Sequence, residues 1–311
     1  MITGIEQLTF GVEDTVKAHQ FLLDWGLVAV GGAANEKCGR RNYEAMNGCR
    51  IVVAPMDDPA LPPAFEPGST LRELTWSVRD SAALDILRKN LAGAPGYADA
   101  PTGPTCIDPN GLALRFALSQ KRRLDVTGVP TNTWDKAARV DAPSAFYERA
   151  TPIEVGHVVV FTPDLKALED FYTSKLGFVV SDRYPGRGLF LRGEAQGGHH
   201  DFFALQLPDG KRGLNHVAFT VRDIHEVFGG GIAFSRLGYE TQLGPGRHPI
   251  SSAYFWYFKS PLGGLFEYYA DEDMLTEKWQ AREFPSKPEL FAEWAIAGGI
   301  DGVTRRQKGA S

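Results

Sequence analysis

The sequence of 311 residues has little of what marks membrane, secreted or nucleic-acid-binding proteins. It contains three cysteines, Cys38, Cys49 and Cys106, an odd number without a Cys-x-x-Cys pair, which is typical of a reducing, cytoplasmic setting. No apolar run approaches the roughly 20 residues that span a bilayer. The N-terminus lacks a basic region followed by an apolar stretch. We therefore expect neither membrane association nor a signal peptide.

Basic residues are also in the minority. Lys and Arg total 33 against 38 Asp and Glu, a formal net charge of −5, which gives no basis for a nucleic-acid partner. What is present is an ordinary globular composition, with 43% apolar and 23% charged residues. The chain is long enough for two domains with a substantial core.

One pattern recurs four times along the chain. In each copy an apolar strand ends at an Asp that can cap a following helix, and these residues are Asp14, Asp80, Asp164 and Asp223. Pro and Gly corners near residues 109 and 261 mark turns into later strands. The pattern predicts four βαβββ modules arranged as two pairs, and hence an α+β fold.

These repeats also predict the domain organisation. We expect an N-terminal module pair at 1–120, a polar connecting segment at 121–152 and a C-terminal module pair at 153–270. The remaining residues, 271–311, are predicted to form a helical tail. Within it, two stretches, 271–280 and 288–296, have helical patterns, and the last ten or so residues are expected to be frayed.

Six of the seven histidines lie between His157 and His248. His157 and His216 stand at equivalent places in the third and fourth modules, and Glu267 lies in an otherwise apolar closing strand. A buried carboxylate is costly unless it is paired, hydrogen-bonded or bound to a metal. Two histidines and one carboxylate form a ligand set that leaves half of an octahedral Fe(II) open. We therefore predict that strand pairing brings these three side chains to one cavity.

The N-terminal pair lacks this ligand set. When the modules are aligned on their capping Asp residues and turn prolines, the positions of the two histidines and the glutamate hold Gln7, Glu73 and Arg115. A guanidinium in place of the carboxylate does not make this metal site. The C-terminal pair is therefore predicted to carry the chemistry, and the N-terminal pair to be structural.

Residues 246–267 resemble the signature of type I extradiol ring-cleavage dioxygenases, which belong to the vicinal oxygen chelate superfamily. The shared anchors are a Gly-x-His that ends at His248, Tyr257 nine residues on, a Pro-x-Gly at 261–263, and Glu267 ten residues after the tyrosine. The resemblance extends over the two-pair layout. It implies the vicinal oxygen chelate fold, in which each module pair forms an open mixed β-barrel, and a homo-oligomeric assembly.

Two positions depart from the family pattern, Trp256 and Ser260. Neither supplies a catalytic atom, so both concern substrate preference more than chemistry. Trp256 and its aromatic neighbours are expected to form an apolar wall against the substrate.

The resemblance implies a role for each remaining candidate. The metal ligands would be His157, His216 and Glu267, and the metal Fe(II), although Mn(II) suits the same ligands. His200 matches the position of the family's acid/base, with its neighbour His199 as the open alternative.

The implied reaction is extradiol (meta) cleavage of a catechol-type aromatic diol, with both atoms of O₂ incorporated, as in the degradation of aromatic compounds. In that reaction, His248 and Tyr257 match residues that hydrogen-bond the substrate. The expected partners are therefore the diol and O₂.

Two other functions stay open at this point. A metal-dependent lyase or isomerase of the glyoxalase type shares the modules, but it usually needs further ligands and has no evident use for His200, His248 and Tyr257 together. A non-catalytic sequestering protein of the bleomycin-resistance type predicts no metal ligands, which the two histidines and Glu267 argue against.

Overall fold

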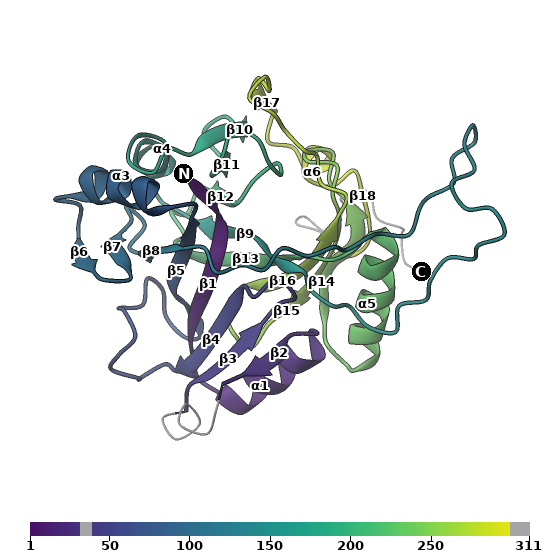
Figure 1. Cartoon of the computed structure of the whole chain (residues 1–311), viewed down its shortest axis with the longest axis horizontal. Helices are drawn as coiled ribbons and strands as arrows, with labels where there is room; N and C mark the ends of the chain where they lie inside the picture. The colour runs from purple at the N-terminus through teal and green to yellow at the C-terminus, as the bar shows by residue number, and fades with distance from the viewer. Residues whose placement is uncertain (32–38, 299–311) are drawn as a thin grey trace.

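The chain forms two mixed β-sheets, one from each half of the sequence (Figure 1). The computed structural model describes residues 1–31 and 39–298. The first module consists of β1 (Ile2–Val12), α1 (Thr15–Asp24), β2 (Val28–Val30), β3 (Arg41–Glu44) and β4 (Arg50–Pro55). The second consists of β5 (Thr70–Val78), α3 (Ser81–Leu91), β6 (Ala98–Ala100), β7 (Gly103–Ile107) and β8 (Ala113–Leu118). Their strand order is β2-β3-β4-β1-β5-β8-β7-β6.

The second sheet repeats this arrangement. The third module consists of β9 (Glu154–Phe161), α4 (Leu165–Ser174), β10 (Val179–Tyr184), β11 (Gly188–Arg192) and β12 (Phe202–Leu205). The fourth consists of β13 (Gly213–Thr220), α5 (Ile224–Arg236), β14 (Thr241–Arg247), β15 (Tyr254–Lys259) and β16 (Leu265–Ala270). With two strands of the tail, β17 (Arg282–Glu283) and β18 (Trp294–Gly298), the order is β17-β10-β11-β12-β9-β13-β16-β15-β14-β18.

The strand pairing confirms the predicted four modules. In every module the first strand is parallel to the last one, as in β9 with β12 and β13 with β16. The first strands of paired modules, β1 with β5 and β9 with β13, are antiparallel to each other. The four predicted Asp residues each accept hydrogen bonds from backbone N–H groups in the first turn of the following helix. The local signals in the sequence therefore define the repeat.

An aromatic core joins the two sheets. The ring of Trp25 stacks on Tyr268 with centroids 3.6 Å apart, and the Tyr268 hydroxyl donates to the Trp25 carbonyl at 2.8 Å. On the other side, Trp76 packs edge-on against Phe178, with ring centroids 5.0 Å apart. Because these side chains are buried between the module pairs, the N-terminal pair supports the strands that carry the candidate site.

Asp108 is a buried carboxyl at this junction. It accepts hydrogen bonds from the N–H groups of Asn110 and Leu112, each at 2.9 Å, and from the hydroxyl of Tyr172 at 3.3 Å. Burial raises the pKa of Asp108 from 3.8 to about 7. The folded protein therefore holds this proton more tightly than the unfolded chain does, so this group's contribution to stability falls as the pH rises from about 4 to about 7.

Asp108→Asn is expected to remove this pH dependence, because the amide oxygen still accepts the two backbone N–H groups and does not ionise. As the pH rises through that window, the unfolding free energy of the variant should increase relative to that of the wild type by up to about 1.4 kcal/mol per pH unit. Urea unfolding from pH 4.5 to 7.5 measures it. Parallel pH profiles of the two proteins would contradict the assignment.

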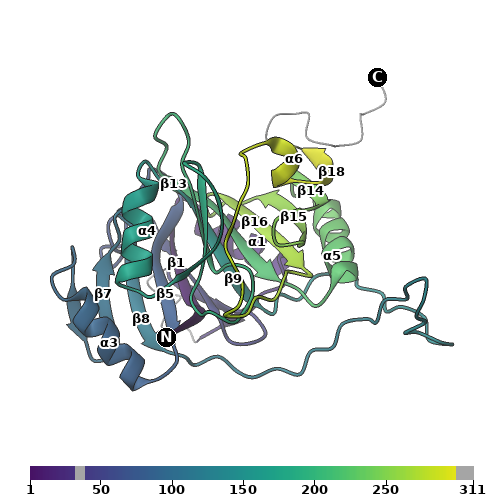
Figure 2. The same cartoon turned by 90° about the horizontal axis from the view of Figure 1, so that it is seen from above.

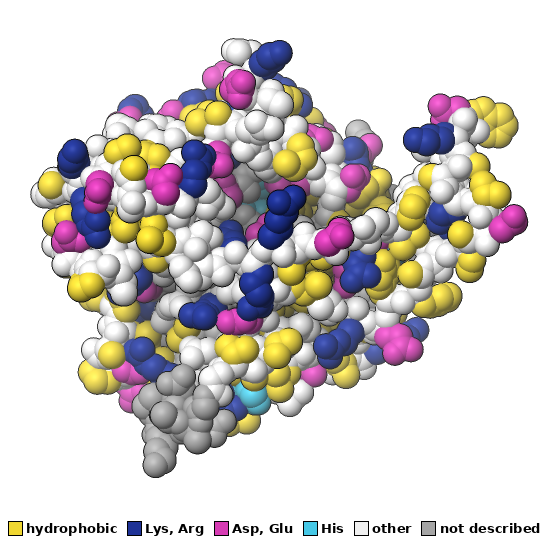
Figure 3. Space-filling view, in the orientation of Figure 1, with side chains coloured by type: hydrophobic (Ala, Val, Ile, Leu, Met, Phe, Trp, Pro, Cys, Tyr) yellow, Lys and Arg dark blue, Asp and Glu magenta, His cyan; other side chains and the backbone are white. Residues whose placement is uncertain are grey.

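The connection between the sheets is extended. β8 ends at Leu118 and β9 begins at Glu154, and the chain between them crosses the molecule and forms an arm that projects beside α5 (Figures 1 and 2). Trp134 and Phe146, in this segment, are fully exposed, and hydrophobic side chains lie along the arm in the space-filling view (Figure 3). The same view shows acidic and basic side chains interspersed over this face.

None of the helices within residues 1–31 and 39–298 has the length and apolar character needed to cross a membrane. Cys49 and Cys106 are buried free thiols, whereas Cys38 lies outside the described residues.

The tail differs from the prediction of a helical segment. Residues 271–280 contain no helix, and the stretch predicted at 288–296 is divided into the short helix α6 (Pro288–Phe291) and strand β18. The reason is tertiary: β18 pairs with the otherwise free edge of β14, Phe291 and Ala292 pack against the second sheet, and Leu275 is buried where it pairs with Gly197. The last ten or so residues, which were predicted to be frayed, lie outside the described residues.

Candidate metal centre

Strand register brings the predicted ligands to one face of the second sheet. Ala218 on β13 pairs with His157 on β9 and with Glu267 on β16, and Glu267 in turn pairs with Tyr257 on β15. His216 lies two residues before Ala218, so its side chain points to the same face. The small side chain of Ala218, between these residues, packs against Ala253 and Tyr269.

The three predicted ligand atoms converge. His157 Nε2 and His216 Nε2 each lie 3.3 Å from Glu267 Oε2, and the two nitrogens are 3.3 Å apart. All three side chains are buried, yet Glu267 Oε2 has no well-aligned hydrogen bond from any described residue. Ligand–metal bonds of about 2.1–2.2 Å place neighbouring ligand atoms about 3 Å apart in an octahedral site. The residues therefore fit a divalent metal.

The charge states also suit a metal. Burial would raise the pKa of Glu267, but the imidazoles of His157, His216 and His248 outweigh it and hold the pKa well below its ordinary value. Burial lowers the pKa of His157 well below its ordinary value, and it also lowers the pKa of His216. At neutral pH the site therefore presents one carboxylate and two neutral imidazoles, the forms in which these groups bind metal.

Neighbouring groups orient the two imidazoles. His216 Nδ1 lies 2.6 Å from the amide oxygen of Asn215, which accepts its proton and leaves Nε2 free to bind. The ring of His157 lies between those of His200 and Tyr269, with centroids 4.1 and 4.9 Å away. Nδ1 of His157 has no hydrogen-bond partner among the described residues, so ring packing and the contacts of Nε2 with Glu267 and His216 hold this ring.

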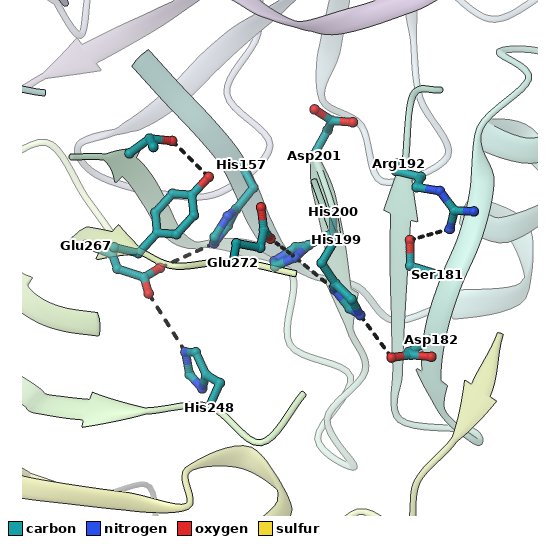
Figure 4. A network of polar contacts seen from close by, with 12 residues as sticks. His157, Ser181, Asp182, Arg192, His199, His200, Asp201, His248, Glu267 and Glu272 are labelled. Carbon is teal, nitrogen blue, oxygen red and sulfur yellow. Dashed lines mark hydrogen bonds and ion pairs between the residues drawn. The ribbon is translucent and has the colours of Figure 1, made fainter. Parts of the chain in front are cut away.

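The structure separates the two adjacent histidines that the sequence left as alternatives. His200 lines a small chamber beside the cluster together with His157, His216 and Glu267. His199 is fully buried and points away from Glu267, and its Nε2 lies 2.9 Å from Asp182 (Figure 4). Only His200 therefore faces the candidate metal position.

Glu272 is a residue that the sequence analysis missed. Its Oε1 lies 3.1 Å from Nδ1 of His200, and the same nitrogen lies 3.3 Å from Nδ1 of His199. Glu272, His157 and His200 also bring three ligand atoms together, as a second possible metal set. No signal in the acidic run 271–273 distinguished Glu272, because its position depends on Asp271, which has a left-handed φ of 64° after β16.

His248 and Tyr257 form a pair at the other side of the cluster. Nδ1 of His248 donates to the carbonyl of Phe291 at 2.7 Å, and Nε2 lies 3.0 Å from the Tyr257 hydroxyl. Burial, reinforced by the charge of Glu267, raises the pKa of Tyr257 well above its ordinary value, so this hydroxyl remains a donor. Figure 4 shows His157 and His248 approaching Glu267 from different sides. Both predicted substrate-contacting residues thus line the chamber.

Trp256, which was also predicted to bind substrate, does not line the chamber, so the structure does not bring it together with the other predicted site residues. Strand alternation places it on the face opposite Tyr257, where its ring packs against Gly231 of α5 and its Nε1 donates to Thr241 at 2.9 Å. Its ring also stacks near Phe258, with centroids 5.6 Å apart. Trp256 is therefore part of the packing between sheet and helix.

Trp256→Phe is accordingly expected to lower the unfolding free energy by about 1–2 kcal/mol, through loss of packing and of one hydrogen bond, and to leave the KM for a diol unchanged. Thermal unfolding and steady-state kinetics of the same preparation measure the two effects. A several-fold rise in KM without a loss of stability would restore Trp256 to the substrate site.

In the N-terminal pair, an ion pair occupies the positions that correspond to His216 and Glu267. Nε and Nη2 of Arg115 each lie 3.0 Å from an oxygen of Glu73, a bidentate pairing. Gln7 donates to Thr9 at 3.2 Å. In the described part of the chain, the groups of residues that could hold a metal lie in the C-terminal pair and, through Glu272, the start of the tail. This agrees with the predicted structural role of the N-terminal pair.

Comparisons with known proteins find a family match in the C-terminal module pair. Residues 154–268 match the family described as the glyoxalase/bleomycin resistance protein/dioxygenase superfamily. The chain is 27% identical to metapyrocatechase 2 of Cupriavidus necator over 315 aligned positions, which cover 94% of this chain and 89% of that protein.

Solved structures share the whole fold. A Mn(II)-bound glyoxalase from Novosphingobium aromaticivorans superposes with a TM-score of 0.75 at 22% identity, covering 99% of this chain and 95% of the other. BphC, a halotolerant catechol dioxygenase, superposes with a TM-score of 0.73 at 18% identity, covering 98% of both chains. The chain therefore carries, at residues 154–268, a domain of the glyoxalase/bleomycin resistance protein/dioxygenase superfamily, and its paired-module vicinal oxygen chelate fold is the one found in extradiol dioxygenases.

Proposed function

We propose that this protein is an Fe(II)-dependent extradiol dioxygenase that cleaves a catechol-type diol with incorporation of both atoms of O₂. The observation that supports it most is the cluster of His157, His216 and Glu267 beside a chamber that also holds His200, His248 and Tyr257. The similarity to metapyrocatechase 2 over 94% of the chain supports the same reaction class.

The ligand set would hold the metal through two imidazoles and one carboxylate. Fe(II) bound there would supply open coordination positions and the electron transfer that allows a diol to react with O₂. Mn(II) suits the same ligands, and Fe(II) remains our proposal for the active form.

The other residues of the chamber would move or hold protons. The imidazole of His200, which lines the chamber, would accept a proton from the diol as it binds and return one later. The hydroxyl of Tyr257 would donate to the substrate oxygens and stabilise negative charge on them, and Nε2 of His248 would do the same when this ring is in its imidazolium form. Phe190 and Phe203, stacked with centroids 4.0 Å apart, line the same chamber, and their apolar rings would limit the entry of water.

A glyoxalase-type lyase or isomerase is the alternative on this fold, and the likeness to the glyoxalase structure does not separate the two. The residues beside the cluster do favour ring cleavage. An acid/base at His200 and a donor pair at His248 and Tyr257 serve a reaction that first deprotonates a diol and then stabilises oxyanions.

The test is O₂ uptake by the protein reconstituted with Fe(II) under nitrogen and then given catechol, 3-methylcatechol or 2,3-dihydroxybiphenyl. We expect one O₂ consumed per diol and a yellow ring-fission product. Tight iron binding with no O₂ uptake on any diol, together with turnover of a glutathione hemithioacetal, would overturn the proposal in favour of the glyoxalase reaction.

A cytoplasmic location and a homo-oligomeric state are part of the same proposal. The few cysteines support the first. Size-exclusion chromatography with light scattering tests the second.

A further inference from the structure

A second cavity extends from the candidate metal centre. The chamber beside Glu267 has a volume of only about 30 Å³, whereas the adjoining cavity has about 410 Å³. The two share His216 and Tyr257 in their walls. The larger volume falls within the range of small-molecule sites, about 300–1,000 Å³. A diol bound at the cluster would therefore have room for a substituent in the larger cavity.

The walls of this cavity are mainly apolar. They come from β9, β12, β14 and α6, and the side chains that form them include Val159, Phe161, Phe203, Leu205, Leu243 and Phe291. The tail closes over it, because the Tyr184 hydroxyl donates to the carbonyl of Leu290 at 2.8 Å. Such walls favour a substituent built of carbon, since it removes apolar surface from water.

The charged residues that line the cavity are both cations. Arg187 lies in the turn between β10 and β11, and Lys287 lies in the exposed segment before α6. No Asp or Glu lines this cavity, and neither cation has an ion-pair partner among the described residues. Arg183, four residues before Arg187, is in contrast paired with Glu169 at 3.1 Å. An apolar cavity with two unpaired cations is complementary to an apolar group that ends in an anion.

We propose that the preferred substrate is a diol whose ring bears an apolar substituent ending in a carboxylate, and that Arg187 and Lys287 bind this carboxylate. The inference rests on the proposed ring-cleavage function, which it narrows to one class of substrate. Guanidinium and carboxylate form paired hydrogen bonds, and the cations also raise the local concentration of an anionic substrate.

The test compares acids with neutral analogues of similar length. The probes are 3-(2,3-dihydroxyphenyl)propanoate against 3-propylcatechol, and 3-(3,4-dihydroxyphenyl)propanoate against 4-propylcatechol. We expect the wild-type protein to prefer one of the acids by ~10-fold in kcat/KM. The double variant Arg187→Gln, Lys287→Gln should lose this preference through a ~10-fold higher KM for the acid, with kcat retained.

Binding gives a readout that does not depend on turnover. Under nitrogen, the preferred acid should raise the Tm of the wild-type protein more than the neutral analogue does, and the double variant should not show this difference. Lys278→Met is the matched control, because Lys278 is an exposed lysine of the same tail that does not line the cavity. This control should keep the wild-type ratio of kcat/KM between the acid and its neutral analogue, and the wild-type difference in Tm.

The outcomes separate the two proposals. If catechol is cleaved but acids and neutral analogues are used equally well, the inference about the carboxylate is wrong and the proposed function stands. An equal loss of kcat/KM for acid and neutral substrates in the double variant would also overturn the inference, since it would indicate that Arg187 and Lys287 have a structural role. If no diol is cleaved, the proposed function is wrong and this inference falls with it.

Discussion

Glu267→Gln is expected to leave the protein folded but unable to retain its metal. The amide keeps the shape of the side chain and removes the negative charge that faces His157 and His216 at 3.3 Å. Because changes to residues that only support metal ligands already cost about 10–100-fold in affinity, loss of a ligand should cost more than about 100-fold. Metal analysis after gel filtration should show almost no bound iron, and O₂ uptake with catechol should fall to background.

Glu272→Gln is the matched control for this variant. Glu272 is a carboxylate on the same chamber, but it belongs to the second set with His157 and His200. We expect Glu272→Gln to retain iron. Loss of iron in Glu272→Gln, with retention in Glu267→Gln, would move the metal to that second set.

His200→Phe is expected to keep iron and to lose ~10²–10⁴-fold in kcat, the usual contribution of general acid–base catalysis. The position tolerates an aromatic ring, since His200 already packs edge-on against Phe190 with centroids 5.1 Å apart. His200→Asn is a second variant, because its amide is polar and can donate a hydrogen bond in the chamber but cannot act as an acid or base. Single-turnover kinetics with catechol, at matched iron content, compares both variants with the wild-type protein.

His199→Phe is the control for this pair of variants. His199 lies behind His200, where its Nε2 contacts Asp182, and Asp182 is also bound by Arg282 at 2.6 Å. Its removal should lower the unfolding free energy by about 1–3 kcal/mol, because Asp182 loses a buried partner, and should change kcat only several-fold. Near-normal turnover in His200→Phe with a large loss in His199→Phe would reverse the assignment.

Much of the fold could be predicted because its signals are local. Each capping Asp lies directly between a strand and the helix that it caps, so a single stretch of sequence contains the whole signal. Because the two halves repeat the same pattern, each candidate ligand in the C-terminal half could be compared with the residue at the corresponding position of the N-terminal half. Arg115 at the level of Glu267 identified the half without the metal ligands, and the structure places an ion pair there.

The tail could not be predicted in the same way. Residues 288–296 do have a helical pattern. Pairing with the free edge of β14 is nevertheless more favourable for part of this stretch, because an isolated short helix is only marginally stable. The structure of this segment therefore depends on a strand more than forty residues earlier in the chain.

The sequence by itself determined the chemistry of the candidate ligands, the module repeat and the half of the chain that carries the site, because strand period and spacing fix which side chains share a face. Tertiary structure decided the rest. It placed Trp256 against α5, chose His200 over His199 for the chamber and brought Glu272 and Lys287 from the tail toward the sheet. These positions depend on contacts between segments far apart in the chain, and neither residue type nor spacing encodes such contacts locally.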